Sequence, residues 1–470
     1  MSRLSSLMDT GKRSMMNSQT ALATTGHNIA SKATEGFSRQ RVEQQTNNPI
    51  GEGNLRIGTG SKAVKVTRIN NSFLEKQIQK ENSQSSYLNS KADAINRVEQ
   101  IYNEQLNKGL GEAMSSFFNS YRELSNTPES APARTLVRES GHALSKEFSR
   151  VYSDLENVQK DLDTQIITQV EEVNQITTEI ASLNEKISQV ELQGIDANDE
   201  RDRRDLLIKK LNEKIDITWG ENETGQVTIT GARAAVLVSG FTSQRLKAHH
   251  INDRDRVEVF FENPSTGQLS QMTKRINGGA LGAAIDVRDN YVEDLKANMN
   301  EMAFTFTKEV NDIHNLGVDL KGKQGGNFFT ISENINDACR TIGIDAEINS
   351  DANRIVTGLA KGGPADNTVA NVISNIQAKA VMNDGTTTFE DYYHAKIGEV
   401  GVYAQRMNRS SESQKNIVSQ LNNVRESISG VSLDEEATKM IEFQKSFDAS
   451  ARMIRTADEM FDTVLNLKRL

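Results

Sequence analysis

Apolar residues recur at seven-residue spacing near both ends of the chain, with polar or small residues between them. Such spacing is typical of a helix that packs along one seam against another helix. The N-terminal seam is Met8, Met15, Leu22 and Ile29, with Leu4 in the alternate position. The C-terminal seam is Leu433, Met440, Phe447, Ile454 and Phe461, with Leu465 beside it. The pattern predicts two terminal helices that pair as a coiled coil.

The N-terminal seam is weak, because Gly11, Ser18 and Thr25 stand where a stable coiled coil carries leucine. The first helix carries more basic than acidic side chains, whereas the last carries more acidic than basic ones, which favours pairing of the two ends. The alternative is two independent surface helices docked on one core. We rank it lower, because both stripes are regular and both lie at the chain extremities.

The strongest helical pattern in the interior runs from about 135 to 192, where apolar residues alternate in steps of three and four. A helix of roughly 60 residues would be on the order of 90 Å long and needs partners along its length. The segments 73–106, 114–124 and 389–429 have matching stripes. We therefore predict a mainly α fold whose elongated helical bundle is built from the N- and C-terminal halves of the chain.

The middle of the chain has a different pattern, with short β-type runs at 215–219, 227–230, 235–238 and 257–262. These runs predict a small β-rich insertion over 212–280, followed by a helix over 290–316 and a mixed segment over 320–385. We expect three domains. Residues 1–45 and 431–470 form an inner coiled coil, residues 46–211 and 386–430 form the bundle, and residues 212–385 form an inserted outer domain.

Composition excludes several classes of function. A net charge of −9 with no block of basic residues argues against a nucleic-acid partner. No window approaches 18 consecutive apolar residues, so no membrane span is expected. The N-terminus lacks the uninterrupted apolar region of a cleaved secretory signal. Cys339 is the only cysteine, so no internal disulfide is possible, and it is expected to be a small buried residue.

No motif proposes an active site, a metal or a cofactor. Gly11 and Gly322 each precede a lysine but lack the rest of a phosphate-binding loop. His249 and His250 are adjacent in a predicted strand and therefore point to opposite faces. The charged run 196–205 lacks the glycine and spacing of a calcium loop, and we interpret it as a solvated helix start with local ion pairs. The expectation is a protein that is not an enzyme.

The run TTGHNIASKATEGFSRQ, residues 24–40, could be a catalytic loop or the joint where the first helix ends. We favour a joint, in which Gly36 allows the chain to reverse, Phe37 anchors the following arm and His27 stays on the helix surface. The run resembles the N-terminal signature of bacterial flagellar axial proteins, the rod, hook and junction proteins. The matching residues are Asn28, Ile29, Ala30, Thr34, Gly36, Phe37 and Arg39.

Three further stretches, residues 198–217, 278–322 and 429–467, are similar to one family among these, hook-associated protein 1. The resemblance implies a structural subunit that self-assembles into the junction ring between hook and filament. It implies contacts with the hook protein and the second junction protein, and an export chaperone in the cytosol that binds the C-terminal region. It also implies export through the flagellar secretion channel to the extracellular flagellum.

Isolated helices with a weak seam gain little stability without packing. We therefore expect 1–45 and 431–470 to be disordered in the monomer and to become ordered on assembly. Three other interpretations remain: a hook or distal-rod protein, a regulatory coiled-coil binding module, and a surface-acting enzyme such as a cell-wall hydrolase. The enzyme would need a carboxylate or Cys/His site within 212–385, where none stands out.

Overall fold

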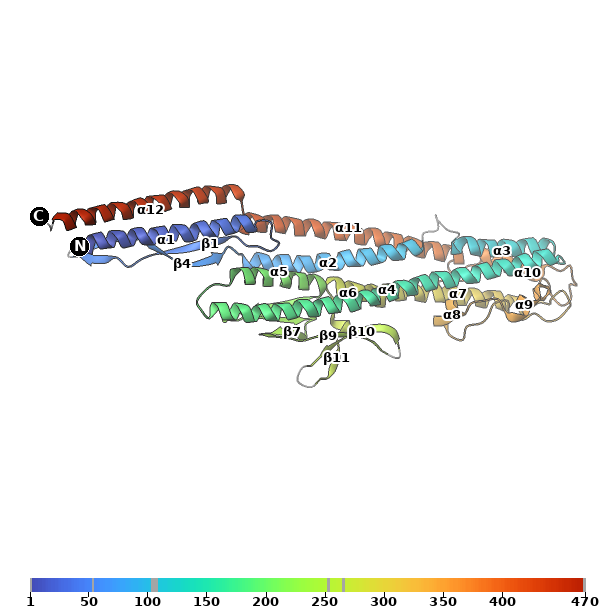
Figure 1. Ribbon diagram of the computed structural model, residues 1–470. Coiled ribbons are helices and arrows are strands. Elements are labelled where there is room, and N and C mark those ends of the chain that lie inside the picture. Colours follow the sequence, from blue (N-terminus) through green and yellow to red (C-terminus); the bar gives the residue numbers. More distant parts are fainter. Residues whose placement is uncertain (1, 53–54, 103–108, 252–253, 264–266, 468–470) are drawn as a thin grey trace.

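The computed structural model describes residues 2–52, 55–102, 109–251, 254–263 and 267–467. The molecule is a long rod (Figure 1). Helices α1 (Ser2–Ser31) and α12 (Leu433–Leu467) lie side by side at one end, together with both chain termini. The rest of the rod is a helical bundle with small antiparallel sheets on one side. The predicted fold class, mainly α with paired terminal helices, is confirmed.

Five helices form the frame of the bundle: α2 (Ser72–Ile101), α3 (Leu110–Asn126), α4 (Ala131–Glu191), α5 (Asn198–Lys214) and α11 (Phe389–Ser429). The predicted long helix is α4, which spans 61 residues. It begins where the Ser130 side chain accepts a hydrogen bond from the Ala133 backbone N–H. Helices α2 and α11, from opposite halves of the chain, pack together as predicted. The last residues of the expected helix 73–106 lie outside the described part of the chain.

Two sheets follow α5, within the predicted β-rich insertion. The first is four-stranded and antiparallel, in the order β5 (Ile217–Glu221), β6 (Val227–Gly231), β7 (Ala235–Ser239), β8 (Thr242–Ser243). The second has the order β11 (Leu269–Gln271), β10 (Arg254–Glu262), β9 (Leu246–Ile251). Both lie against the side of α4.

The segment after the sheets differs from the expected outer domain. Helix α6 (Gly279–Asp286), the π-helical turn η2 (Val287–Tyr291) and α7 (Val292–His314) pack against α2 and α4 as part of the bundle. Phe306 of α7 makes edge contacts with Phe117 of α3 and Phe389 of α11. The sequence pattern predicts the helix but not its partners, because an apolar stripe does not specify which face it meets.

Short elements then close the far end of the rod and connect its helices. The helices are α8 (Ala338–Thr341), α9 (Ala346–Ser350) and α10 (Thr368–Asn375). Single 3-10 turns are η1 (Thr273–Arg275), η3 (Ile335–Asp337), η4 (Ala352–Arg354) and η5 (Ile376–Ala378). Cys339 is fully buried here, and burial raises the pKa of its thiol to about 12. No helix in the described ranges is both long enough and apolar enough to cross a membrane.

A β-hairpin beside α1 is absent from the sequence prediction, which assigns residues from 46 onward to the helical bundle. Strands β1 (Gln40–Thr46) and β4 (Ser61–Arg68) pair antiparallel, and β2 (Ile50–Glu52) pairs with β3 (Leu55–Ile57) nearer the tip. Most residues of β1 and β4 are polar, and only Gln40 is buried, so their alternation of apolar and polar positions is faint. The hairpin packs along α1.

One buried histidine at the far end of the rod is held in a defined tautomer. The Nδ1 of His314 lies 2.6 Å from the Gly326 carbonyl oxygen, to which it donates, and its Nε2 accepts from the Val356 backbone N–H at 2.9 Å. A second proton on the ring would leave Nε2–H facing another donor. Burial accordingly lowers the pKa of His314 to about 4.

We expect this histidine to make stability depend on pH. Between pH 6.5 and 4 the unfolded chain binds a proton at His314 and the folded chain does not, so stability falls as the pH is lowered through this window, by on the order of 3 kcal/mol. Denaturant unfolding at pH 7 and pH 4.5 measures the difference. His314→Gln should unfold more easily at pH 7 but lose less stability on acidification. Parallel pH curves for the two proteins would contradict the assignment.

Candidate functional site

The seam between α1 and α12 is formed by small residues. A Cβ atom on Gly11 would lie 2.8 Å from the Ile454 Cγ1, so the helices touch closely here. Ser450 donates to Ser14 at 2.7 Å between their Oγ atoms, and Ser18 donates to Ser446 at 3.1 Å. Glycine and small hydroxyl-bearing residues thus bring the two backbones together.

The large seam residues predicted from the sequence lie on the flanks of this contact. Those that are half-buried are Leu4, Met8, Met15, Leu22, Ile29, Met440, Phe447, Ile454 and Phe461. Leu433 and Leu465 are exposed. The structure therefore brings Ile454 against α1 and leaves a smaller part of each other half-buried side chain available to a further surface.

Two asparagines on α1 hold the hairpin. The Asn17 side chain donates to the Ser61 carbonyl at 2.8 Å and accepts from the Ala63 N–H at 2.7 Å. The Asn28 side chain, three helical turns later, makes the same pair of bonds to the backbone of Gln40, both at 2.9 Å. Each amide satisfies a backbone donor and acceptor of a strand, and this fixes the hairpin along the helix.

Asn28 also takes part in a cluster that we call the latch, formed by Asn28, Arg39 and Glu436. Glu436, in the first turn of α12, is only 1% exposed. Its Oε2 accepts from Asn28 Nδ2 at 2.9 Å and its Oε1 accepts from Arg39 Nε at 2.8 Å. The Arg39 backbone N–H donates to the carbonyl of Ser429, the last residue of α11, at 3.0 Å. The latch therefore joins α1, the arm after it, α11 and α12.

The charges of the latch are paired with each other. Burial alone would lower the pKa of Arg39, but its bonds to Glu436 and to the exposed Glu435 hold that pKa above its ordinary value. Two residues of the flagellar signature, Asn28 and Arg39, thus meet Glu436, which lies about 400 residues away. No local pattern in the sequence identifies Glu436 as their partner.

The other signature residues shape the arm. Gly36 has φ +84°, and a Cβ there would lie 3.1 Å from the Leu206 Cβ, so the reversal requires glycine. The half-buried Phe37 ring packs edge-on against His27 at 5.4 Å between centroids. Ala30 and Thr34 are exposed, and Ile29 is half-buried. His27 Nε2 lies 3.2 Å from Asp199 Oδ1, a surface ion pair and no part of a catalytic set.

One face of α5 receives this arm through three acidic residues spaced three apart. Asp199 accepts from the Gln40 side chain at 2.8 Å. Asp202 accepts from the Ser38 N–H at 2.8 Å, and Arg68 donates to Asp202 at 2.7 Å and to Asp205 at 2.9 Å. Arg68 is partly desolvated, but the two carboxylates still hold its pKa above the ordinary value. The acidic face of α5 therefore anchors both the arm and the end of β4.

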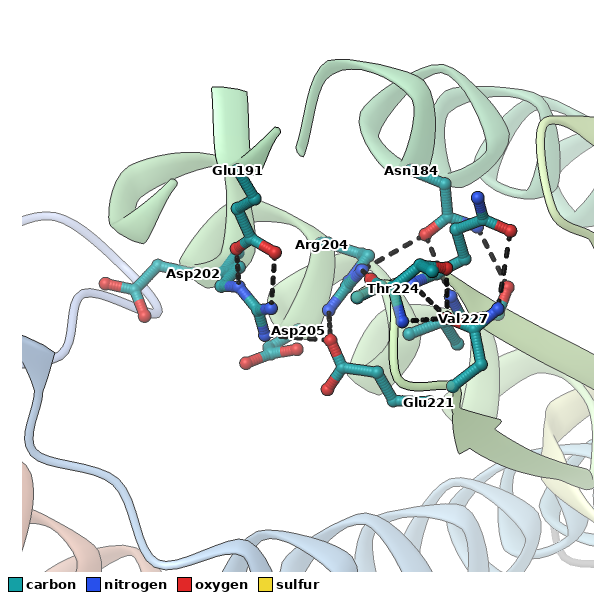
Figure 2. Close-up of polar contacts among 12 residues, drawn as sticks. Asn184, Glu191, Asp202, Arg204, Asp205, Glu221, Thr224 and Val227 are labelled. Carbon is teal, nitrogen blue, oxygen red and sulfur yellow. Dashed lines mark hydrogen bonds and ion pairs between the residues drawn. The ribbon is translucent and has the colours of Figure 1, made fainter. Parts of the chain in front are cut away.

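Two arginines of α5 bind the end of α4 and the β5–β6 turn, and Figure 2 shows Arg204 turned toward Asn184 and Glu221. Arg204 is 1% exposed and donates to Asn184 Oδ1, the Gly225 carbonyl and Glu221 Oε1 at 3.1, 2.6 and 3.0 Å. Arg201 pairs with Glu191 at 2.5 Å, and this bond lowers the pKa of Glu191. These contacts attach α5 to the end of α4 and to the β5–β6 turn.

The interpretation of residues 196–205 as a solvated helix start holds for Asp196, Asp199 and Arg203, which are exposed, and is wrong for Asp202 and Arg204, which are buried. Helical geometry spreads these side chains around α5, so that the arm meets Asp199 and Asp202 while the end of α4 and the β5–β6 turn meet Arg201 and Arg204. Exposed ion pairs of the kind that the sequence predicts are made by Arg203 with Glu179 and by Asp199 with His27. The spacing of the acidic residues was the available signal, but it does not reveal that a partner covers each face.

The joint holds α1, α5, α11 and α12 together, and its polar groups bond to one another. Among the described residues, no group of three or more His, Cys, Asp or Glu side chains is placed to hold a metal ion. The adjacent His249 and His250 lie in β9, as predicted. The interactions in the joint are hydrogen bonds and ion pairs between segments far apart in sequence.

Comparison with known proteins gives this arrangement a family. Residues 95–329 match the model for the flagellar hook-associated protein FlgK helical domain, and residues 425–467 match that for the flagellar basal body rod FlgEFG protein C-terminal region. The chain is 31% identical over 495 residues to flagellar hook-associated protein 1 of Bacillus subtilis, covering 98% of this chain and 97% of that protein. It is 24% identical to the Escherichia coli protein of the same name, covering 99% and 100%.

A solved structure has the same fold. The flagellar hook junction protein FlgK from Burkholderia pseudomallei superposes with a TM-score of 0.67 at 14% identity, over 75% of this chain and 100% of that one. The C-terminal match is shared with rod proteins, but the helical-domain match and the near full-length relatives separate this chain from hook and rod proteins. The chain belongs to the hook-associated protein 1 (FlgK) family and is a structural, non-enzymatic hook–filament junction protein of the bacterial flagellum.

Proposed function

We propose that copies of this protein assemble into a ring through the α1–α12 pair. The observation that carries the proposal is the seam, in which small residues meet and the larger apolar residues are only partly buried. A pair of helices whose large apolar residues are not fully buried is marginal by itself. Packing of the flanks against neighbouring copies would supply the missing burial, and closed rings are a common outcome of such head-to-tail contacts.

The layers of the rod suggest the domain roles. Residues 1–45 and 431–470 would form the inner layer, with residue 1 and residues 468–470 outside the described ranges. Residues 46–211 and 386–430 would form the surrounding bundle together with α6 and α7, which share its core. Within 212–385, the sheets after α5 would then lie outermost. The latch connects the inner layer to the bundle. Contacts between copies in the inner layer would therefore also set the orientation of the bundle.

The partners follow from membership in a family of axial proteins. We infer contacts with the hook protein on one side of the ring and the second junction protein on the other. Exposed apolar side chains on α12, among them Ile441 and Met460, would favour aggregation before assembly. An export chaperone in the cytosol that covers this C-terminal region would prevent it. Passage through the flagellar secretion channel, without a cleaved signal, would deliver the protein to the extracellular flagellum.

Hydrogen exchange tests the inner layer. In the purified monomer, amides of 2–45 and 431–467 should exchange quickly and those of α4 slowly, because the seam alone does not hold the pair. In hooks isolated with the protein attached, both terminal segments should become protected by several orders of magnitude. Mass spectrometry of peptides from each region provides the measurement. Slow exchange at both ends of the monomer would overturn the proposal of ordering on assembly.

A further inference from the structure

The second half of α11 exposes a regular apolar stripe. Ile417, Val424 and Ile428 are 41%, 47% and 41% exposed, and Leu421 between them is half-buried. Steps of four, three and four residues place these side chains on one face of the helix. Isolated exposed aliphatic residues are common on protein surfaces, but four in register along three turns are not.

The face of α11 next to the stripe is already occupied. Arg425 pairs with Glu75 of α2 at 2.6 Å, and the Gln414 side chain donates to Glu81 Oε2 at 2.6 Å. Ser411 bonds to Asn89 farther along the same helix pair. The contact with α2 therefore covers the face of α11 that carries Ser411, Gln414 and Arg425. Within the described part of the chain, nothing accounts for the stripe.

The residues around the stripe are polar but mostly uncharged. Over 412–428 the exposed uncharged polar residues are Ser413, Asn416, Ser419, Gln420, Asn423 and Ser427, and the exposed charged residues are Glu412, Lys415 and Glu426. Solvated helix faces usually carry many charges, as the exposed side of α4 does with Glu147, Arg150 and Asp154. Depletion of charge around an apolar centre is the composition of protein–protein interfaces.

We infer that this stripe is the lateral contact through which one rod packs against a second copy of the same chain in the assembled ring. The inference rests on the proposed self-assembly. Helix α11 runs along the long axis of the rod (Figure 1), so a stripe on one of its faces runs lengthwise along the rod. A face of that kind fits a neighbouring rod lying alongside, and in a ring every lateral neighbour is another copy.

The size of the stripe also favours a second copy over a freely diffusing partner. Four aliphatic side chains, each less than half exposed, offer much less than the ~800 Å² per partner that a specific complex usually buries. A copy held in place by its own terminal helices needs no such area, because its effective concentration at the stripe is already high. The exposed Leu433 and Ile441 of α12 follow directly along the chain and would extend the same contact.

Site-specific photo-crosslinking tests the inference in the full-length protein. Val424 is replaced by p-benzoylphenylalanine, the protein is expressed in flagellated cells lacking the native copy, and isolated hooks are irradiated. We expect an adduct of two copies of this chain, at least five-fold stronger than from the matched position Asn423. That residue is exposed and lies about 100° away around the same helix. The variant Val424→Lys should leave the melting temperature of the monomer unchanged while filament subunits are shed several-fold faster.

Other results would overturn the inference that the stripe contacts a second copy. An adduct with a different flagellar protein, equal adducts at 423 and 424, or no adduct in hooks that retain filaments would exclude a second copy at the stripe. The same probe at Ile441 of α12 separates this failure from failure of the ring itself. Adducts between copies at 441 without any at 424 would refute the lateral contact alone, whereas absence at both would count against self-assembly.

Discussion

Replacing Arg204 with alanine is expected to lower the free energy of unfolding by about 2–4 kcal/mol, because buried hydrogen bonds from a charged donor are lost. The guanidinium donates three hydrogen bonds that join α5 to α4 and to the β5–β6 turn. Alanine would leave the Gly225 carbonyl without this donor, whereas Asn184 Oδ1 keeps the Val227 N–H at 3.2 Å and Glu221 keeps Arg201 at 2.8 Å. Denaturant unfolding followed by circular dichroism measures the loss.

Its neighbour Arg203 provides a matched control. Arg203 has the same side chain one position earlier in the same helix, but it is two-thirds exposed and pairs only with Glu179 at the surface. Exposed ion pairs contribute little, so Arg203→Ala should change stability by less than about 0.5 kcal/mol. Equal losses for the two substitutions would show that helix propensity or overall charge, and not the buried network, sets the stability of this region.

This pair of arginines also shows where sequence patterns stop being informative. The long helix α4 and the exact extent of α11 follow from apolar periodicity, because one element contains all the information needed to define its own stripe. The run 196–205 is equally regular, yet two of its charged residues, Asp202 and Arg204, are buried. Alternating charge indicates a solvated surface only when nothing covers the helix, and what covers it is set by segments tens or hundreds of residues away.

The joint has the same limit. The signature at 28–39 locates the bend, and Gly36 has the positive φ that a reversal needs. The roles of Asn28 and Arg39 depend on Glu436, which is one of several acidic residues suited to the start of a helix. The β1–β4 hairpin cannot be predicted from the sequence for a related reason. Its strands are held by asparagine side chains of α1 and not by an apolar face, so the usual alternation is weak.

The latch is expected to determine whether α1 and α12 can assemble with other copies. Glu436→Ala would leave Arg39, whose side chain is 12% exposed, with only the exposed Glu435 as counter-charge. We expect this to weaken the coupling of α12 to the arm by about 3–5 kcal/mol, since the remaining charge stays largely buried. Cells that carry only this variant should keep their hooks but shed filament subunits into the medium, at a level approaching that of a strain without the gene.

Two further variants identify the physical cause. Glu435→Gln alters the neighbouring carboxylate, which is 62% exposed and also lies 2.8 Å from Arg39, so it should shed few filament subunits. The double variant Arg39→Met with Glu436→Leu removes both charges and should restore much of the filament, because apolar residues of similar volume often replace a buried ion pair without loss. If the double variant sheds as much as Glu436→Ala, the charge itself is required. If Glu436→Ala retains its filaments, the latch does not hold the inner helices in register.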